Sequence, residues 1–275
     1  MRINTNIAAL NSNRILQGTN TAVSRTLGRL SSGYRINRAA DDAAGLGIAN
    51  RLRADIRALR QASRNAEQAV ATLQIAEGAT QSIQSIVERM KELATQAGSD
   101  NTDADGRTRI DAEFQALIQE IDRIVDTTKF QGQALLDGSF TGEFMVSSSG
   151  DYAGADLVTL TAVDLSTLTA TITANASDLT TTANARTVLT DVDTALGEVA
   201  SALGAIGAAQ NRMEHAFNNV NIAIENYAAA ESTIRDADFA AEMTELTRTQ
   251  ILQQAGIAML AQANAAPQAI LGLLR

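Results

Sequence analysis

Residues able to carry out covalent or metal chemistry are scarce in this chain of 275 residues. There is no cysteine and a single histidine, His215, which excludes thiol nucleophiles, cysteine-ligated zinc and the usual multi-histidine metal sites. His215 lies inside a long apolar seam, and the spacing implies no Ser or Asp partner for it. We therefore expect no enzyme, no cofactor and no metal site here.

One loop resembles half of a calcium site. Asn101, Asp103, Asp105 and Gly106 match positions one, three, five and six of an EF-hand loop. Position twelve, where a bidentate Glu is required, is Ala112. The pattern therefore favours a polar loop that caps the helix following it.

A stripe of arginines follows one helix face at Arg53, Arg57, Arg60 and Arg64. Contact with nucleic acid is one interpretation, but the net charge is -9 and aromatic residues make up only 3%. The alternatives are a solvated helix face and a set of ion pairs with an acidic partner surface. Residues 1–70 hold 11 Arg against 4 acids, whereas the remaining residues are acidic overall.

The first half of the chain has the 3,4 spacing of amphipathic helices. Apolar residues recur between Ile3 and Tyr34, and Gly33 then suits a helix end with positive φ. The spacing resumes from about Ala44 to Ala97, and a further helix carries Ile110, Phe114 and Ile121.

The second half has the strictest pattern, a 4,3 repeat from Val188 to Tyr227. A last helix is predicted from Ile251 to Leu274, where the polar interruptions argue against a membrane span. Between the halves, alternation predicts strands over Val158–Ala162 and Leu168–Ala174.

The predicted fold class is mainly α: a long antiparallel helical coiled-coil rod formed by the N- and C-terminal arms, with a small β-hairpin region in the middle. The expected divisions are an inner-core helix and spoke (1–42), rod helices (43–135), a short hairpin region without a large outer domain (136–185), the C-terminal rod helix (186–240) and a C-terminal inner-core helix (241–275).

Both ends of the chain closely resemble bacterial flagellin. At the N-terminal end the matching runs are Ile3-Asn4-Thr5-Asn6, Leu30-Ser31-Ser32-Gly33-Tyr34-Arg35-Ile36-Asn37 and Ala40-Asp41-Asp42-Ala43-Ala44-Gly45. At the C-terminal end they are Ile251-Leu252-Gln253-Gln254-Ala255-Gly256, Leu260-Ala261-Gln262-Ala263-Asn264, Pro267-Gln268 and Leu273-Leu274-Arg275. The two sets occur in the family's order and cover about residues 1–140 and 186–275.

The resemblance implies a structural subunit that is exported unfolded through the flagellar secretion channel and self-assembles outside the cell into a smooth, thin filament for swimming motility. The implied partners are other copies of the chain, an export chaperone at the C-terminal helix, the flagellar export apparatus, and the cap and hook-junction proteins. No nucleic acid and no membrane are expected. The expected self-assembly residues are Ile3, Ile7, Leu10, Leu27, Leu30, Ile251, Leu252, Ile257, Leu260, Ile270, Leu271 and Leu274.

The resemblance also implies recognition by the innate-immune Toll-like flagellin receptor. Arg89, Leu93, Gln96 and Glu113 match the family's contact positions, and Met90 and Lys91 depart from the motif. The competing interpretation is that Leu93 packs inside the helices and Arg89 is a surface charge.

Two other classes of function remain as alternatives. A hook–filament junction protein shares weaker versions of these ends. An enzyme on a helical scaffold would need chemistry in the middle region, but residues 130–185 contain no His, Cys, Lys or Arg.

Overall fold

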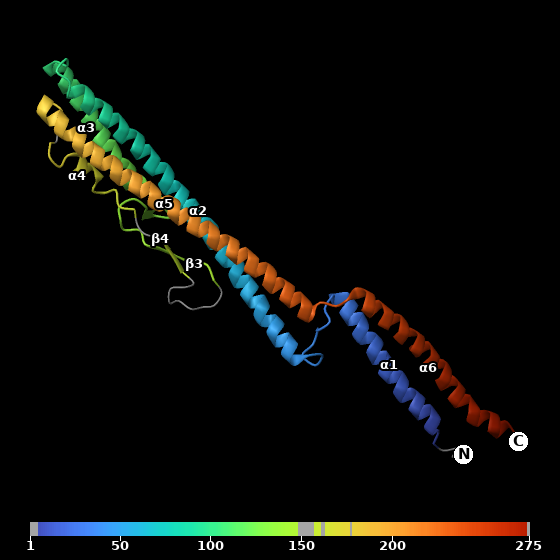
Figure 1. The fold of residues 1–275 in the computed structure, drawn as a ribbon. Helices are drawn as coiled ribbons and strands as arrows, with labels where there is room; N and C mark the ends of the chain where they lie inside the picture. The colour runs from blue at the N-terminus through green and yellow to red at the C-terminus, as the bar shows by residue number, and fades with distance from the viewer. Residues whose placement is uncertain (1–4, 148–156, 161–162, 177, 274–275) are drawn as a thin grey trace. The chain divides into compact units, whose positions relative to one another are not determined.

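The computed structural model describes residues 5–147, 157–160, 163–176 and 178–273, with the side chains of 267–273 excepted. Six helices and four short strands follow one another along this part of the chain (Figure 1). They are α1 (Ile7–Ser32), α2 (Ala43–Ala97), α3 (Ala104–Thr127), β1 (Lys129–Phe130), β2 (Gln133–Ala134), β3 (Gly142–Met145), β4 (Leu157–Leu160), α4 (Leu168–Ile172), α5 (Thr182–Arg235) and α6 (Phe239–Leu273). The mainly α class is confirmed.

The chain forms two compact units, and the boundaries between them fall inside α2 and α5. Unit 1 comprises residues 1–54 and 226–275, and unit 2 comprises residues 55–225. Unit 1 therefore combines the two ends of the sequence, and unit 2 is its continuous central part.

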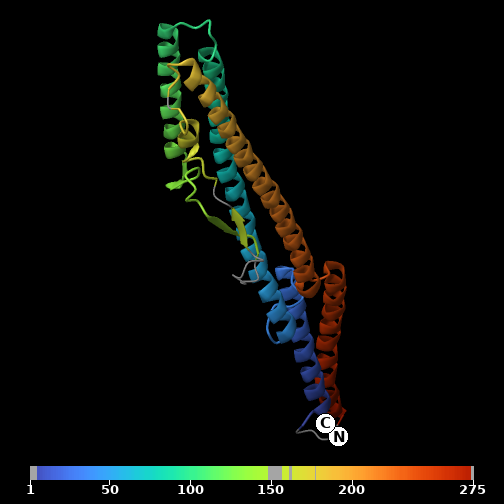
Figure 2. The same ribbon diagram turned by 60° about the vertical axis from the view of Figure 1, so that its left-hand side comes forward.

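In unit 2, α2 and α5 run antiparallel, with α3 beside α2 (Figure 2). Lys91 Nζ lies 2.5 Å from Asp193 Oδ1, and the Gln210 amide donates to Glu77 at 2.7 Å. The contact further along α5, at Gln210, is made to the residue further back along α2, Glu77. The two contacts therefore fix the antiparallel register of the helices.

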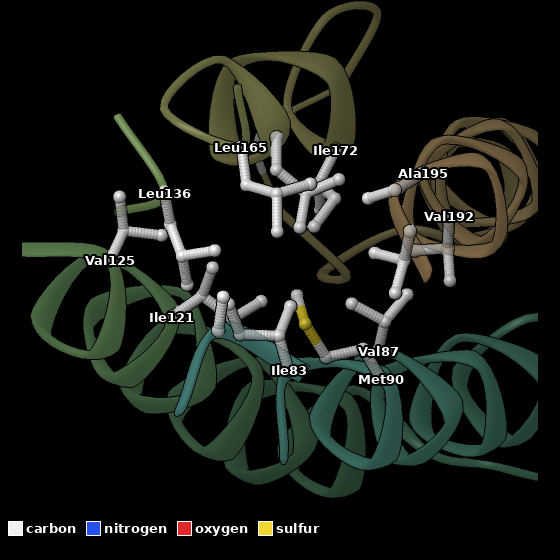
Figure 3. Close-up of a cluster of buried hydrophobic side chains, with 14 of the residues drawn as sticks. Ile83, Val87, Met90, Ile121, Val125, Leu136, Leu165, Ile172, Val192 and Ala195 are labelled. Atoms are coloured by element: carbon white, nitrogen blue, oxygen red, sulfur yellow. The ribbon is translucent and has the colours of Figure 1, made fainter. Parts of the chain in front are cut away.

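The core of unit 2 is built from the predicted apolar seams. On α5, Val188, Val192, Ala195 and Val199 are fully buried. Figure 3 shows Ile83, Val87 and Met90 of α2 pointing toward side chains from α3, α4 and α5. The 4,3 repeat weakens near its end, since Tyr227, which belongs to unit 1, is 37% exposed.

The predicted strand over Leu168–Ala174 is wrong, because Leu168–Ile172 forms α4. Leu168 and Ile172 are four residues apart, so a helix places both on the same face, and both are fully buried in the core. The threonine hydroxyls, which suggested a strand, donate to carbonyls four residues back, as from Thr173 to Thr169 at 2.9 Å.

The second predicted strand is confirmed over Leu157–Leu160, which pairs antiparallel with β3, and its expected end at Ala162 lies outside the described residues. The β1–β2 hairpin turns at Gln131 (φ 50°) and Gly132 (φ 85°), two consecutive positive φ values typical of a tight hairpin turn.

The calcium-like loop is a helix cap. The Asp103 carboxylate accepts a 2.8 Å hydrogen bond from the Gly106 backbone N–H at the start of α3. Among the described residues, no three His, Asp or Glu side chains are grouped so as to hold a metal ion.

Of the described helices, α5 alone is long and apolar enough to cross a membrane by length and composition. Ten of its residues are buried in the protein, among them Val188, Val192 and Val199.

Candidate assembly surface on the terminal helices

Helix α1 begins and ends at clear local signals, and α6 begins at one. The Asn6 side chain accepts a hydrogen bond from Ala9 N at 3.1 Å, and Gly33 closes α1 with φ 73°. The Asp238 carboxylate accepts from Ala240 N at 2.9 Å at the first turn of α6. The last helix therefore starts at Phe239, twelve residues before the expected Ile251.

Within unit 1, α1 and α6 lie side by side and antiparallel (Figure 1). Three polar contacts fix their register. Asn6 Nδ2 donates to the Ala263 carbonyl at 2.8 Å, Gln253 Nε2 donates to Asn20 Oδ1 at 2.8 Å, and Arg29 pairs with Glu242 at 3.0 Å.

The seam between α1 and α6 consists mostly of small or polar residues. We define it by the less exposed residues spaced 3,4 along each helix. They are Ala9, Ser12, Leu16, Thr19, Val23, Thr26 and Leu30 on α1, and Glu242, Leu246, Thr249, Gln253, Gly256, Leu260 and Ala263 on α6. Nine of these fourteen are Ala, Gly, Ser, Thr, Gln or Glu, so the pair buries little apolar surface.

Gly256 allows one of the few large seam residues to fit. A Cβ at this position would lie 3.2 Å from Leu16 Cδ1, tighter than ordinary van der Waals contact. The glycine therefore lets α6 approach α1 at Leu16.

Most of the large apolar side chains of α1 and α6 whose burial is described point away from this seam. Ten of the fourteen exposed large hydrophobic residues in the described part of the chain lie on these two helices. They are Ile7, Leu10, Ile15, Leu27, Phe239, Met243, Ile251, Leu252, Ile257 and Met259, with exposed fractions from 43% to 66%. A surface this apolar is typical of a protein–protein interface.

The expected self-assembly residues fall into three groups. Six are exposed in the isolated chain: Ile7, Leu10, Leu27, Ile251, Leu252 and Ile257. Leu30 and Leu260 are half-buried in the seam. Ile3 and Leu274 lie outside the described residues, as do the side chains of Ile270 and Leu271.

A compact joint connects the segments of unit 1. Arg35 N donates to the Arg235 carbonyl at 2.7 Å, and Ala237 N donates to the Gly33 carbonyl at 2.9 Å. The Arg235 guanidinium lies 4.1 Å from the centre of the Tyr34 ring, a cation–π arrangement. These contacts tie the end of α1 to the end of α5.

The expected receptor-contact residues lie together on α2 and α3, but one of them is not accessible. Arg89 forms ion pairs with Glu92 at 2.8 Å and with Glu113 at 2.9 Å. The hydrogen bonds to these two carboxylates, that to Glu92 being the larger cause, raise the pKa of Arg89. Gln96 is exposed, whereas Leu93 is 1% exposed inside the unit 2 core. Leu93 is therefore a packing residue in this structure.

The arginine stripe is only partly free for partners. Arg53 bonds to Glu231 of α5 at 3.1 Å, and Arg64 bonds to Gln61 of its own helix. Arg57 and Arg60 are exposed and have no ion-pair partner among the described residues.

Sequence reasoning missed the long-range pairs Arg29–Glu242 and Arg53–Glu231. Their partners are 213 and 178 residues apart, and no local pattern links them. The antiparallel register of the helices is the one signal that could have predicted them.

Comparison with known proteins agrees with this architecture. The family description "Bacterial flagellin N-terminal helical region" fits residues 3–141, and "Bacterial flagellin C-terminal helical region" fits residues 189–274. A flagellin of Halalkalibacterium halodurans is 45% identical over the whole of both chains. The flagellar filament 33 kDa core protein of Treponema phagedenis is 39% identical, again over the whole of both chains.

The crystal structure of Bacillus cereus flagellin resembles this one with a TM-score of 0.50 and 31% sequence identity. The similarity covers 57% of this chain and 88% of that one. Two matched helical regions in order, together with full-length relatives at this identity, show that the chain belongs to the bacterial flagellin family, as a structural subunit of the flagellar filament.

Proposed function

We propose that the chain builds its filament by burying the outward apolar residues of α1 and α6 between copies. The observation that carries this proposal is the contrast between a small, polar seam and large apolar side chains that face away from it. Burying surface of this kind contributes about 25 cal/mol per Å², and in the filament neighbouring copies supply the cover.

In this proposal α1 and α6 are disordered in the dilute monomer and fold during assembly. The seam alone buries too little apolar surface to offset the chain entropy of ordering two long helices. The terminal helices then form the inner part of the filament, and the helices of unit 2 form the layer around it. In this proposal residues 136–185 contribute no large outer domain. A head-to-tail contact that does not close into a ring gives an open helical polymer.

Seeded elongation tests this function. Purified chain is added to short filament seeds, and growth is followed by electron microscopy. We expect the full chain to elongate the seeds and a chain lacking residues 251–275 to leave them unchanged. Elongation by the truncated chain would refute the proposal.

Hydrogen exchange on the monomer tests whether α1 and α6 are disordered before assembly. Fully protected amides in these two helices would contradict the proposed disorder.

Export before assembly follows from the same exposed helices. We propose that the chain leaves the cell unfolded through the flagellar export apparatus, with a chaperone covering the apolar face of α6 in the cytosol. Assembly then takes place at the cap, beyond the hook-junction proteins. The absence of cysteine is compatible with this route, because no crosslink could trap the chain. Co-purification of a chaperone that is lost on removing α6 is the expected result, and retention would contradict it.

Recognition by the Toll-like flagellin receptor is proposed for the exposed side chains of Arg89, Gln96 and Glu113. Leu93 holds α2 in the core beneath them. In an epithelial reporter assay, Arg89→Ala is expected to lower the signal. Arg123→Ala is the matched control, because Arg123 also forms an exposed ion pair, with Glu120. Equal signals from both variants would remove this claim.

The free arginines of the α2 stripe are proposed to face an acidic surface of a neighbouring copy. Reversal of Arg53 to Glu would also break its bond to Glu231, so Arg57→Glu and Arg60→Glu are the cleaner tests. Both are expected to impair polymerisation, and normal polymerisation by both would rule the contact out.

Two alternatives are less well supported. The relatives described above are named as flagellins or filament core proteins, which favours a filament subunit over a junction protein. Copy number separates them, since junction proteins are made in few copies. An enzymatic role is not proposed, and a hydrolase screen of the purified chain is the direct check.

A further inference from the structure

A polar pocket in unit 1 is not explained by the apolar assembly surface. It lies between the C-terminal half of α1 and the turn at residues 37–41, and its volume is about 330 Å³. Its charged lining consists of Arg25, Arg29, Arg38 and Asp41, and the hydroxyl groups of Thr21 and Ser24 also line it.

The positive charge of this pocket is only partly neutralised. Arg29 is paired with Glu242 of α6 at 3.0 Å. Arg25 and Arg38 form no ion pair among the described residues, although the Asp41 carboxylate of the same pocket is near enough to Arg25 and Arg29 to attract them electrostatically. Two guanidinium groups, each able to bind a carboxylate with two parallel hydrogen bonds, are therefore available in one pocket.

The turn that carries Arg38 is held in place before any ligand arrives. Asp41 Oδ2 accepts hydrogen bonds from Arg38 N at 3.0 Å and Asn37 N at 3.3 Å, and Asp41 N donates to the Arg38 carbonyl at 2.9 Å. Once α1 has folded in the filament, these bonds hold Arg38 in one place beside it, which favours a specific site over a loose charge patch.

The net charges of the two units indicate which part of the protein could supply a carboxylate to this pocket. Unit 1 contains 11 basic and 7 acidic residues, a net charge of +4. Unit 2 contains 11 basic and 24 acidic residues, a net charge of -13. The acids of unit 1 are largely committed: Glu231 and Glu242 form ion pairs, while Asp42 and Asp238 accept backbone N–H groups at helix starts.

We propose that this pocket binds a carboxylate side chain from unit 2 of a second copy of the chain. The inference rests on the proposed polymerisation, since it names a contact between copies in the filament. Unlike the apolar surface, this contact fixes which part of one copy meets which part of the next, because a charge pair needs one register.

Carbodiimide crosslinking of an Arg38→Lys variant tests the contact. The variant keeps the positive charge and adds an amine to a chain that has only two lysines, Lys91 and Lys129, besides its N-terminus. Filaments are grown from a mixture of isotope-labelled and unlabelled copies, so that mass spectrometry distinguishes crosslinks between copies from those within one copy. The Lys91–Asp193 pair is the internal control within one copy.

The expected result is a crosslink from position 38 to an acidic residue of unit 2 that joins two different copies. It should form in filaments and be lost in the monomer. Arg14→Lys is the matched control, because Arg14 is an exposed arginine of α1 that does not line the pocket.

The inference fails if filaments of the variant form and Lys91–Asp193 crosslinks, but position 38 joins only Asp41 of its own chain or nothing. That result leaves polymerisation standing and overturns only the contact. Failure of wild-type chain to polymerise at all would overturn the proposed function instead.

A charge reversal gives a second, independent measurement. Arg25→Glu is expected to raise the concentration of chain left unpolymerised about tenfold, because it replaces attraction by repulsion in the pocket. Arg14→Glu should change it much less. An Arg25→Glu chain that polymerises as well as the Arg14→Glu chain contradicts the proposal.

Discussion

Shortening Ile251 to alanine should weaken assembly without weakening unit 2. Ile251 is 60% exposed on α6, and the substitution removes three carbon atoms. At about 0.8 kcal/mol per buried carbon these are worth about 2.4 kcal/mol. The share exposed on the folded helix, about 1.4 kcal/mol, comes from neighbouring copies alone, and the remainder is also gained on assembly because α6 is proposed to fold only there. The critical concentration for polymerisation should therefore rise at least about tenfold.

The assay is sedimentation of filaments at steady state, with the supernatant concentration as the readout. Two alanine variants serve as controls. Ile75→Ala changes an isoleucine of α2 that is 42% exposed outside the terminal helices, and should leave the critical concentration nearly unchanged. Ile83→Ala changes a fully buried residue and should lower the unfolding free energy of unit 2 by about 2–5 kcal/mol. An unchanged critical concentration for Ile251→Ala, or an equal rise for Ile75→Ala, would refute the reasoning.

Three further substitutions or conditions test other parts of the structure. Met90→Ala should cost about 2–5 kcal/mol of unfolding free energy in denaturant titration, since Met90 is fully buried; a loss under about 1 kcal/mol would be inconsistent with its position. Gly256→Val should raise the critical concentration because its branched side chain would meet Leu16, whereas Gly256→Ala needs only a small shift of that side chain and should polymerise; equal behaviour of the two contradicts the close approach. The pKa of Asp41 lies below its ordinary value, chiefly because Arg38 N donates a hydrogen bond to the carboxylate. The bonded carboxylate therefore stabilises the turn at pH values above the pKa of Asp41 in the unfolded chain, and this stabilisation is lost as the pH falls through the pKa in the folded chain. An NMR titration that gave the Asp41 carboxyl an ordinary pKa would contradict this.

The long helices could be predicted because their sequence periods are unambiguous. The expected helix over Ala44–Ala97 and the break at Gly33 agree with α2 and the end of α1 within a residue. The apolar run from Ile251 covers only the later part of α6, because its first turns carry Glu242 and Glu245, whereas the expected division at residue 241 lies two residues from the observed start.

Other features depend on contacts that the sequence does not record. The α4 segment was predicted as a strand because its two buried residues, Leu168 and Ile172, are four positions apart. That spacing puts them on one face of a helix and equally on one face of a strand, and the small residues between them do not distinguish the two. The pocket at Arg25 and Arg38 was not foreseen either. It exists because a turn ten residues after α1 folds back onto that helix, which no local pattern predicts.

The seam between α1 and α6 has a mechanical consequence. Few bulky side chains interlock across it, and three polar contacts, together with the fit of Leu16 against Gly256, set the axial position of one helix against the other. Sliding by a fraction of a turn therefore disturbs little packing. When a fibre bends, material on its outer side stretches and material on its inner side shortens. We expect smooth helix pairs of this kind to absorb such strain by shear, so that curvature does not require any helix to break.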